Sequence, residues 1–193
     1  MLPCMKTFMA ALHHFKASGV LTDVNLKLSD ESNVQCHRLV LMAASPYFKA
    51  MFESDFEEST KKEIQLKFPN PDTMRQLVAY FYSGEIAVDA DNVQEIAIAS
   101  DFLCLKDLKN ECDDLMATLV DTSNCIALRH FAKKYKFDKL MCTTGDIILE
   151  NFKEVVRSCA DFGSLTEEEL VEVVSDDKLN AEFEDIVFDA VVR

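Results

Sequence analysis

Three side chains that can bind metals, carry protons or hold anions stand in a row at Cys36, His37 and Arg38. They are followed at once by an apolar run, LVLMAA, at residues 39–44. Adjacent residues of a strand point to opposite faces, so the Cys36 thiol and the His37 imidazole cannot act on each other. We interpret Cys36 as a core residue and His37 as a capping residue at a polar seam between two structural elements.

Metal, nucleotide and nucleophile chemistry find no support elsewhere in the chain. The candidate ligands Cys36, His37, Cys125 and His130 lack zinc-type spacing, and no C-x-x-C occurs. With 4 Gly in the sequence, there is no G-x-G-x-x-G, P-loop or G-x-S-x-G motif. We therefore predict a protein that is not an enzyme and that holds no metal and no cofactor.

The 7 Cys are scattered and odd in number, which is typical of a reducing compartment. Cys36, Cys112 and Cys125 fall on or beside apolar faces, and no cation at helical spacing is clearly placed to activate them. We therefore expect the cysteines to be structurally inert and to react slowly with thiol reagents. The expected location is cytoplasmic, with the nucleus as the alternative.

The formal net charge of −14 is spread over the whole chain. A uniformly acidic surface repels phosphate backbones and anionic lipids, so we expect neither nucleic-acid nor membrane binding. The sequence also lacks the run of about 18 apolar residues that a membrane span needs. Protein partners are the remaining class.

Hydrophobic spacing organises the first part of the chain into a small sheet and helices. Helical spacing of Met5, Phe8, Leu12 and Phe15 predicts an opening amphipathic helix. Alternating apolar residues predict strands near 24–28, 34–36 and 64–68. Further helices are predicted from their capping residues: one begins at Ser45 and Pro46, and another runs from Asn70 and Pro71 to Gly84.

The rest of the chain reads as helices, including one with a capping box from Thr166 to Glu169. VDTSN at residues 120–124 is interpreted as a joint between domains. We predict an α/β domain at residues 1–120, a small sheet wrapped by helices, and an all-α domain of helix pairs at 121–193. Because the last helical periodicity still runs at Arg193, we expect the natural chain to continue.

One acidic segment, SDFEES at residues 54–59, carries a single large aromatic residue, Phe56. Large apolar side chains are mostly buried, which favours Phe56 tucked into the core. The alternative is an exposed anchor for a partner. Periodicity does not distinguish the two.

The order of these features resembles a BTB (POZ) domain followed by the BACK domain of kelch-like proteins. The resemblance covers roughly residues 5–193. The matching segments of the first domain are LTDVNLKL, CHRLVLMAASPYFKAMFESDFEES, IQLKF and LVAYFYSGEIAVDADNVQEIAIASDFLCL. Those of the second are DTSNCIALRHFAKKYKFDKL, FKEVVRS and LTEEELVEVVSDDKLNAEFEDIVFDAVV.

The resemblance implies a homodimeric substrate adaptor of a cullin-3 RING ubiquitin ligase. It implies that Phe56, Glu57 and Glu58 form the cullin-binding motif, which reverses the preference for a buried Phe56. The opening helix, with Met5, Phe8, Leu12 and Phe15, would be exchanged between subunits. Asp23, His37 and Arg38 would lie near the dimer interface, with Asp23 and Arg38 as a buried charged pair.

By the same resemblance, residues 122–152 match the 3-box that completes the cullin groove. The substrate would bind a further C-terminal domain, a kelch propeller, that this sequence does not contain. CADFG, residues 159–163, departs from the family pattern. Two alternatives stay open. One is a dimeric BTB-BACK scaffold without ligase function, and the other is a BTB transcription factor, which would require zinc fingers.

Overall fold

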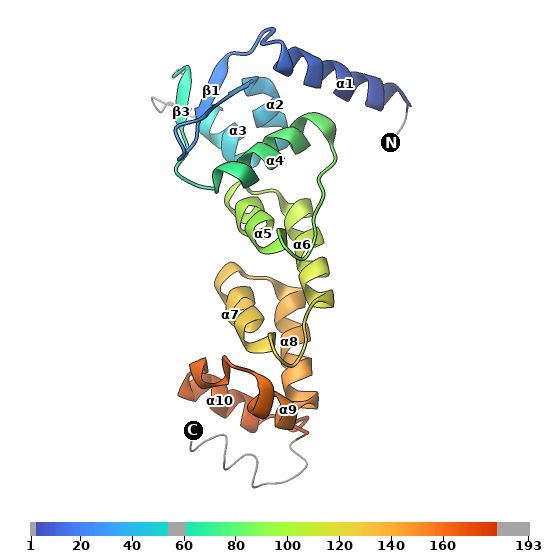
Figure 1. The fold of residues 1–193 in the computed structure, drawn as a ribbon, viewed down its shortest axis with the longest axis vertical. Coiled ribbons are helices and arrows are strands. Elements are labelled where there is room, and N and C mark those ends of the chain that lie inside the picture. Colours follow the sequence, from blue (N-terminus) through green and yellow to red (C-terminus); the bar gives the residue numbers. More distant parts are fainter. Residues whose placement is uncertain (1–2, 54–60, 181–193) are drawn as a thin grey trace. The chain divides into compact units, whose positions relative to one another are not determined.

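The computed structural model describes residues 3–53 and 61–180 of the chain (Figure 1). The chain divides into two compact units, Met1–Lys109 and Asn110–Arg193, which are described separately. The division falls within helix α6, Lys106–Thr118, before the joint that the sequence suggests at residues 120–124. No helix in the described ranges combines the length and the hydropathy needed to cross a bilayer.

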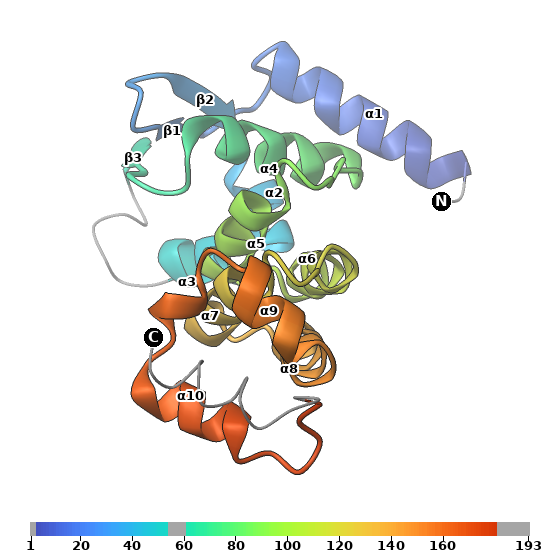
Figure 2. The same cartoon turned by 60° about the horizontal axis from the view of Figure 1, so that its bottom comes forward.

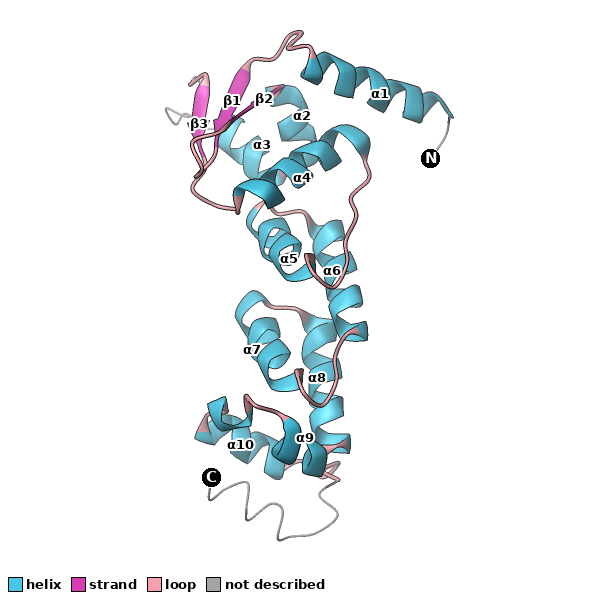
Figure 3. Ribbon diagram, in the orientation of Figure 1, coloured by secondary structure: helices cyan, strands magenta, loops and turns pink. Residues whose placement is uncertain are grey.

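The first unit contains a three-stranded sheet of order β2-β1-β3 (Figure 3). Strand β1, Val24–Lys27, runs antiparallel to β2, Asn33–Cys36, and parallel to β3, Glu63–Gln65. The inward face is fully apolar and consists of Val24, Leu26, Leu28, Cys36, Ile64 and Leu66. The predicted alternation is therefore confirmed, and Cys36 is a core residue.

The third strand is shorter than predicted. It ends at Gln65, and Phe68 is 39% exposed instead of continuing the buried face. Pro69 follows and lacks the N–H that a further ladder hydrogen bond would use. The strand therefore cannot extend past Phe68, and it ends three residues earlier.

Helices surround the sheet in the first unit. Their bounds are α1 Pro3–Ala17, α2 Arg38–Ala44, α3 Pro46–Glu53, α4 Pro71–Ser83 and α5 Val93–Phe102. The predicted signals at the ends of α4 are confirmed: the Asn70 side chain accepts a hydrogen bond of 2.9 Å from the Asp72 amide, and Gly84 ends the helix in the left-handed region at φ 72°. The glycine is needed there because a Cβ atom is strained at positive φ.

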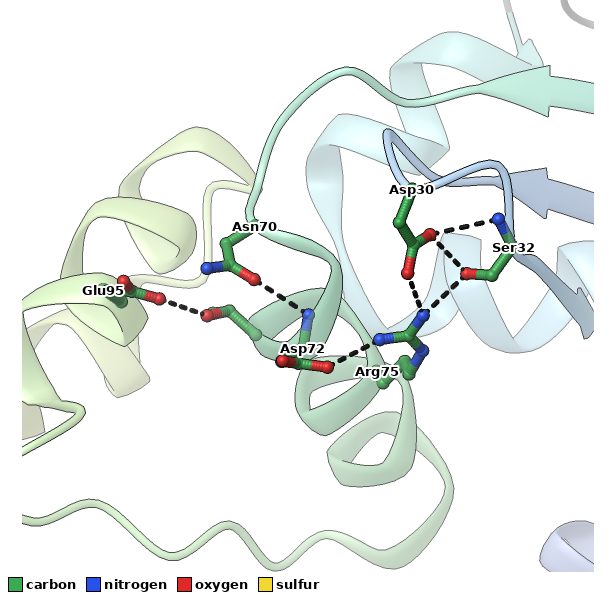
Figure 4. Close-up of polar contacts among 7 residues, drawn as sticks. Asp30, Ser32, Asn70, Asp72, Arg75 and Glu95 are labelled. Carbon is green, nitrogen blue, oxygen red and sulfur yellow. Dashed lines mark hydrogen bonds and ion pairs between the residues drawn. The ribbon is translucent and has the colours of Figure 1, made fainter.

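A polar network fastens the β1–β2 turn to α4 (Figure 4). The guanidinium of Arg75 donates to the Asp30 carboxylate, to Ser32 Oγ at 2.7 Å and to Asp72 Oδ1 at 2.6 Å. Hydrogen bonds from Ser32, and then Arg75, lower the pKa of Asp30 to about 2. The network holds the end of the hairpin against the first turn of the helix.

The second unit is all helical, as predicted. It contains α7 Cys125–Tyr135, α8 Asp138–Glu150, α9 Phe152–Ser158 and α10 Glu167–Val174, with a short 3-10 helix at Phe162–Ser164. The segment that departs from the family pattern leads into this 3-10 turn. Phe162 is buried there, edge-to-face with Phe152 at a ring-centroid distance of 6.2 Å.

Side chains cap two helices of the second unit. Thr166 and Glu169 form the predicted capping box of α10. The Asp113 carboxylate accepts hydrogen bonds from the backbone amides of Lys139, at 3.0 Å, and Leu140, at 2.8 Å, in the first turn of α8. The C-terminal half of α6 thereby fixes the start of α8.

The turns before α5 and α7 are built alike. Asp89 and Asp121 each accept a hydrogen bond from an asparagine amide three residues on and return one to that asparagine's side chain. A residue in the left-handed region follows each helix, Cys104 at φ 59° two residues after α5 and Lys136 at φ 58° directly after α7. Each feature recurs 32 residues later, 89 to 121 and 104 to 136, so α5–α6 and α7–α8 form a tandem repeat of one helical hairpin.

Candidate docking and dimerisation surfaces

The opening helix α1 exposes large apolar side chains. Phe8 is 57% exposed and Phe15 is 43% exposed, while Leu12 is half-buried. Met5 belongs to the same helix. Phenylalanines left in water on one helix indicate a face that packs against another molecule.

Helix α1 lies beside α4 (Figure 2). A groove of about 320 Å³ runs between them, lined by Lys6, Met9, Ala10, His13, Tyr82, Ser83 and Glu85. Residues of α1 other than the predicted face therefore line this groove. Phe8 and Phe15 do not line this groove.

The structure brings the three residues of the predicted polar seam together at the start of α2. His37 is the N-cap residue; its ring Nδ1 lies 2.8 Å from the Tyr82 hydroxyl and its Nε2 lies 2.8 Å from the carbonyl oxygen of Val20. Asp23 Oδ1 accepts a hydrogen bond of 2.7 Å from the Arg38 backbone amide, at the first residue of the helix. A carboxylate is favourable there because the amide groups of a helix N-terminus point at it.

Asp23 and Arg38 meet differently from the buried charged pair that the resemblance implies. The hydrogen bond joins the carboxylate to the Arg38 backbone, and Asp23 is exposed. The Arg38 guanidinium instead donates to the carbonyl oxygen of Lys61 and lies 4.8 Å from the ring centroid of Phe52. Arg38 thus contacts residues on both sides of segment 54–60.

The predicted cullin-binding residues Phe56, Glu57 and Glu58 lie outside the described residues. Next to that segment in sequence, α3 and the stretch after β3 contribute Tyr47 and Phe68 to an aromatic cluster with Phe102 of α5. Ring centroids are 4.7 Å apart for Tyr47–Phe102 and 5.0 Å apart for Phe68–Phe102. Phe68 is 39% and Phe102 36% exposed, so the cluster offers an aromatic surface to a partner.

Sequence reasoning missed this cluster. The alternation of apolar residues near 64–68 predicts that Phe68 lies on the buried face of a strand. The sequence around Phe102 does not indicate a surface role. The contact depends on three elements meeting in space, and no periodicity within one element reports it. Pro69 was the available signal, since it places Phe68 beyond the sheet.

In the second unit, a buried carboxylate joins α10 to α7. Glu169 accepts hydrogen bonds from Lys133 Nζ at 2.7 Å and the Thr166 amide at 3.1 Å, with His130 Nε2 at 3.3 Å. The Lys133 contact, followed by the Thr166 amide, lowers the pKa of Glu169 to about 2. Glu169 thus completes the capping box at the start of α10 and also links α10 to α7.

The thiols divide into two groups. Cys36, Cys112 and Cys125 are buried as expected, and burial raises the pKa of each to about 12. Cys159 is also buried, whereas Cys4, Cys104 and Cys142 are exposed, so burial does not extend to all of the cysteines as expected. Within residues 3–53 and 61–180, no group of three or more histidine, cysteine or acidic side chains could hold a metal ion.

Comparison with known proteins shows which family the chain belongs to. A model of the BTB/POZ domain matches residues 12–120, and a model described as BTB And C-terminal Kelch, or BACK, matches residues 125–193. Kelch-like protein 3 of Mus musculus is 33% identical over 181 residues, and Kelch-like protein 2 of Homo sapiens is 32% identical over 188 residues.

These alignments cover 94% and 97% of this chain but 30% and 31% of the relatives. The chain therefore spans less than a third of the length of the kelch-like proteins it matches. The two matched regions follow each other in the order that the sequence motifs indicate. The chain belongs to the BTB/POZ family and carries the BTB and BACK regions of a kelch-like protein.

Proposed function

We propose that the chain is the dimeric, non-catalytic adaptor module of a cullin-3 RING ubiquitin ligase. Segment 54–60, with Phe56, Glu57 and Glu58, docks the cullin. The BTB region joins two copies, and a kelch propeller in the longer protein holds the substrate. Membership of the kelch-like BTB-BACK family supports this reading.

The observation that carries the proposal is the exposed aromatic cluster of Tyr47, Phe68 and Phe102. It lies on α3, on the stretch after β3 and on α5, and two of these elements flank the proposed motif in sequence. Binding hot spots are commonly aromatic anchors in a patch of this kind, with charged residues at the rim. Phe56 and the cluster would together form the apolar centre of the interface, with Glu57 and Glu58 at its edge.

Arg38 of the polar seam contacts residues on both sides of the proposed docking segment. Arg38 contacts Phe52 at the end of α3 and the carbonyl of Lys61 just before β3. The guanidinium of Arg38 makes both contacts. The backbone amide of the same residue donates a hydrogen bond to Asp23. The residues that lead into and out of the docking segment are thereby held on one side chain, which reduces the ordering cost of binding.

Calorimetry with the purified N-terminal domain of cullin-3 tests the proposal. Phe56→Ala should weaken binding by about 2 kcal/mol, on the order of thirtyfold in Kd, because a buried aromatic anchor is lost. Glu58→Ala should weaken it less, since rim charges mainly tune association rates. Val171→Ala, on an exposed residue of α10, is the matched control and should bind like wild type.

Two results would contradict the proposal in different ways. Absence of cullin binding by the wild-type chain at micromolar concentration, with the dimer intact, would identify a scaffold without ligase function. A loss of about 3 to 5 kcal/mol of folding stability in Phe56→Ala would instead show that Phe56 belongs to the core.

A further inference from the structure

Two buried thiols of the second unit lie in contact. Cys125 is the first residue of α7, and Cys159 directly follows α9. The two side chains lie in hydrogen-bond contact with each other. Both belong to one buried apolar cluster that also contains Phe152 and Phe162. Two residues that are far apart in the sequence therefore place their sulfur atoms side by side in the core.

The turn before α7 holds both sulfur atoms in place. The Cys125 thiol donates to the carbonyl oxygen of Thr122 at 3.7 Å, and the Cys159 thiol donates to the carbonyl oxygen of Ser123 at 3.3 Å. The acceptors belong to consecutive residues, so both thiols are fixed beside the same stretch of backbone. The contact between the thiols is therefore set by two separate hydrogen bonds to this turn.

The step from this contact to a covalent bond is short. A disulfide holds its sulfur atoms about 2.0 Å apart, so the two thiols approach each other further by side-chain rotation. Cys125 begins a helix, and Cys159 follows one with an extended backbone at φ −78° and ψ 114°. Neither residue lies in a helix interior, where the backbone hydrogen bonds would resist an adjustment. The two side chains are placed to bond without the displacement of a helix.

Cys36 and Cys112 are buried as deeply as Cys125 but have other neighbours. Burial, and after it charged side chains, shift the pKa values of these two thiols. For Cys125, burial and then the neighbouring Cys159 raise the pKa to about 12. Cys159 also opens the segment CADFG, residues 159–163, in which the chain departs from the family pattern. The pair is therefore a feature of this chain that the resemblance does not imply.

We propose that Cys125 and Cys159 form an intramolecular disulfide when the chain is exposed to hydrogen peroxide. Cys159 is 7% exposed and Cys125 is 0% exposed, so the Cys159 sulfur meets the oxidant first. It attacks one peroxide oxygen, the O–O bond breaks, and a sulfenic acid and one water are formed. The Cys125 sulfur then attacks the Cys159 sulfur, and the sulfenic hydroxyl leaves with the Cys125 proton as a second water. Two electrons pass from the two thiols to the peroxide.

Burial makes this reaction slow and selective. The thiolate is the reactive form of cysteine, and both thiols are buried, so the first step takes place while the second unit is locally open. When the unit closes again, the native contact returns Cys125 to the oxidised Cys159. We therefore expect one defined bond that forms over hours and not within minutes. The reaction is independent of cullin docking.

Peptide mapping of the full 193-residue chain tests the pair. Exposed thiols react first and cross-link copies, so serine replaces them in a background variant, Cys4→Ser/Cys104→Ser/Cys142→Ser. After hydrogen peroxide and alkylation, this variant should contain one disulfide, between the peptides of Cys125 and Cys159. Cys36 and Cys112 should remain free thiols, and dithiothreitol should reverse the bond.

Matched controls use the same background variant. Cys112→Ser removes a buried thiol outside the pair and should leave the bond unchanged, whereas Cys159→Ser should abolish it. Oxidation in concentrated urea should instead distribute Cys125 among several partners. The proposal is overturned if the folded background variant forms no bond between Cys125 and Cys159 under peroxide that oxidises the exposed thiols of wild type. It is also overturned if Cys125 pairs equally often with Cys36 or Cys112.

Hydrogen–deuterium exchange gives a second measurement that needs no substitution. Closing the loop between Cys125 and Cys159 removes conformational freedom mainly from open and unfolded states. The amides of α7 and α9 in the oxidised wild-type chain should therefore exchange about tenfold more slowly or less, and dithiothreitol should restore the original rates. Unchanged or faster exchange with the bond present would show that the disulfide distorts the second unit, and the native contact would then not be its origin.

Discussion

At the scale of single residues, the sequence predicted which polar side chains are structural but could not predict their partners. His37 and Asp23 both act at the start of α2, as a seam between sheet and helices requires. The resemblance implies a buried pair of Asp23 and Arg38, and the structure shows an exposed Asp23 carboxylate that accepts from the Arg38 backbone amide. The guanidinium binds a backbone carbonyl and an aromatic ring. Guanidinium groups form both contacts readily.

Glu169 allows a residue-level prediction about acid stability. Its pKa is lowered from the ordinary 4.5 to about 2 in the folded chain. The stabilisation is therefore complete above pH 4.5 and is lost as the pH falls from there toward 2. Glu169→Gln, which keeps the capping box, should cost about 1–2 kcal/mol at pH 7, a discounted figure because Lys133 is exposed to screening water.

Urea unfolding of wild type and Glu169→Gln between pH 7 and pH 3 measures this difference. The two stabilities should converge as the pH falls. Glu172→Gln is the control: its carboxylate lies 3.6 Å from Arg129 and is 69% exposed, so it should change stability by less than about 0.5 kcal/mol. A constant difference between wild type and Glu169→Gln over this pH range would show that the Glu169 charge is not the cause.

Thiol reactivity should follow burial residue by residue. In the native chain a thiol reagent should modify Cys4, Cys104 and Cys142 within minutes, because these side chains are exposed. Cys36, Cys112, Cys125 and Cys159 are buried and should react only on unfolding. Peptide mapping by mass spectrometry identifies the modified positions. Rapid native modification of any of the four buried thiols would disagree with the core described above.

At the scale of elements, helix ends whose signals lie within a few consecutive residues are predictable from the sequence. Caps supplied by residues far away in the sequence are not. The Asn70 cap, the Gly84 stop and the box of Thr166 and Glu169 are each contained in a few consecutive residues, and each was predicted correctly. The cap of α8 comes from Asp113, 26 residues before Lys139, and no local pattern indicates it. The tandem hairpin repeat was readable from the spacing of Asp89, Asn92, Asp121 and Asn124 and went unrecognised.

The cap of α8 gives a prediction with a control in the neighbouring residue. Asp113→Ala leaves two amide groups of the first turn without their acceptor and should cost about 1–2 kcal/mol. Asp114→Ala removes a solvent-exposed ion pair with Lys139 and should cost less than about 0.5 kcal/mol. Urea unfolding at neutral pH measures both. Equal costs would mean that Asp113 acts as a surface charge and not as a cap.

At the scale of the whole molecule, the sequence and the structure support the proposed adaptor role in different ways. The sequence indicates the family, and the structure identifies the exposed apolar faces. The order of motifs over nearly the whole chain indicates the family, and the two family models agree with that order. The structure adds the exposed faces. Exposure could not be predicted for Phe8, Phe15 or Phe102, because apolar periodicity reports an apolar face and not what covers it.

The last prediction concerns assembly through α1. A dimer would bury Phe8 and Phe15 in a two-fold interface, where each patch is used twice. Light scattering of the wild-type chain should therefore give twice the subunit mass of 21.9 kDa. Phe8→Glu with Phe15→Glu should place unpaired charges in the interface and return the single-subunit mass. Val171→Glu, at an exposed residue of α10, should leave the dimer intact. A single-subunit mass for wild type would refute dimerisation, and dissociation by Val171→Glu would move the interface to the second unit.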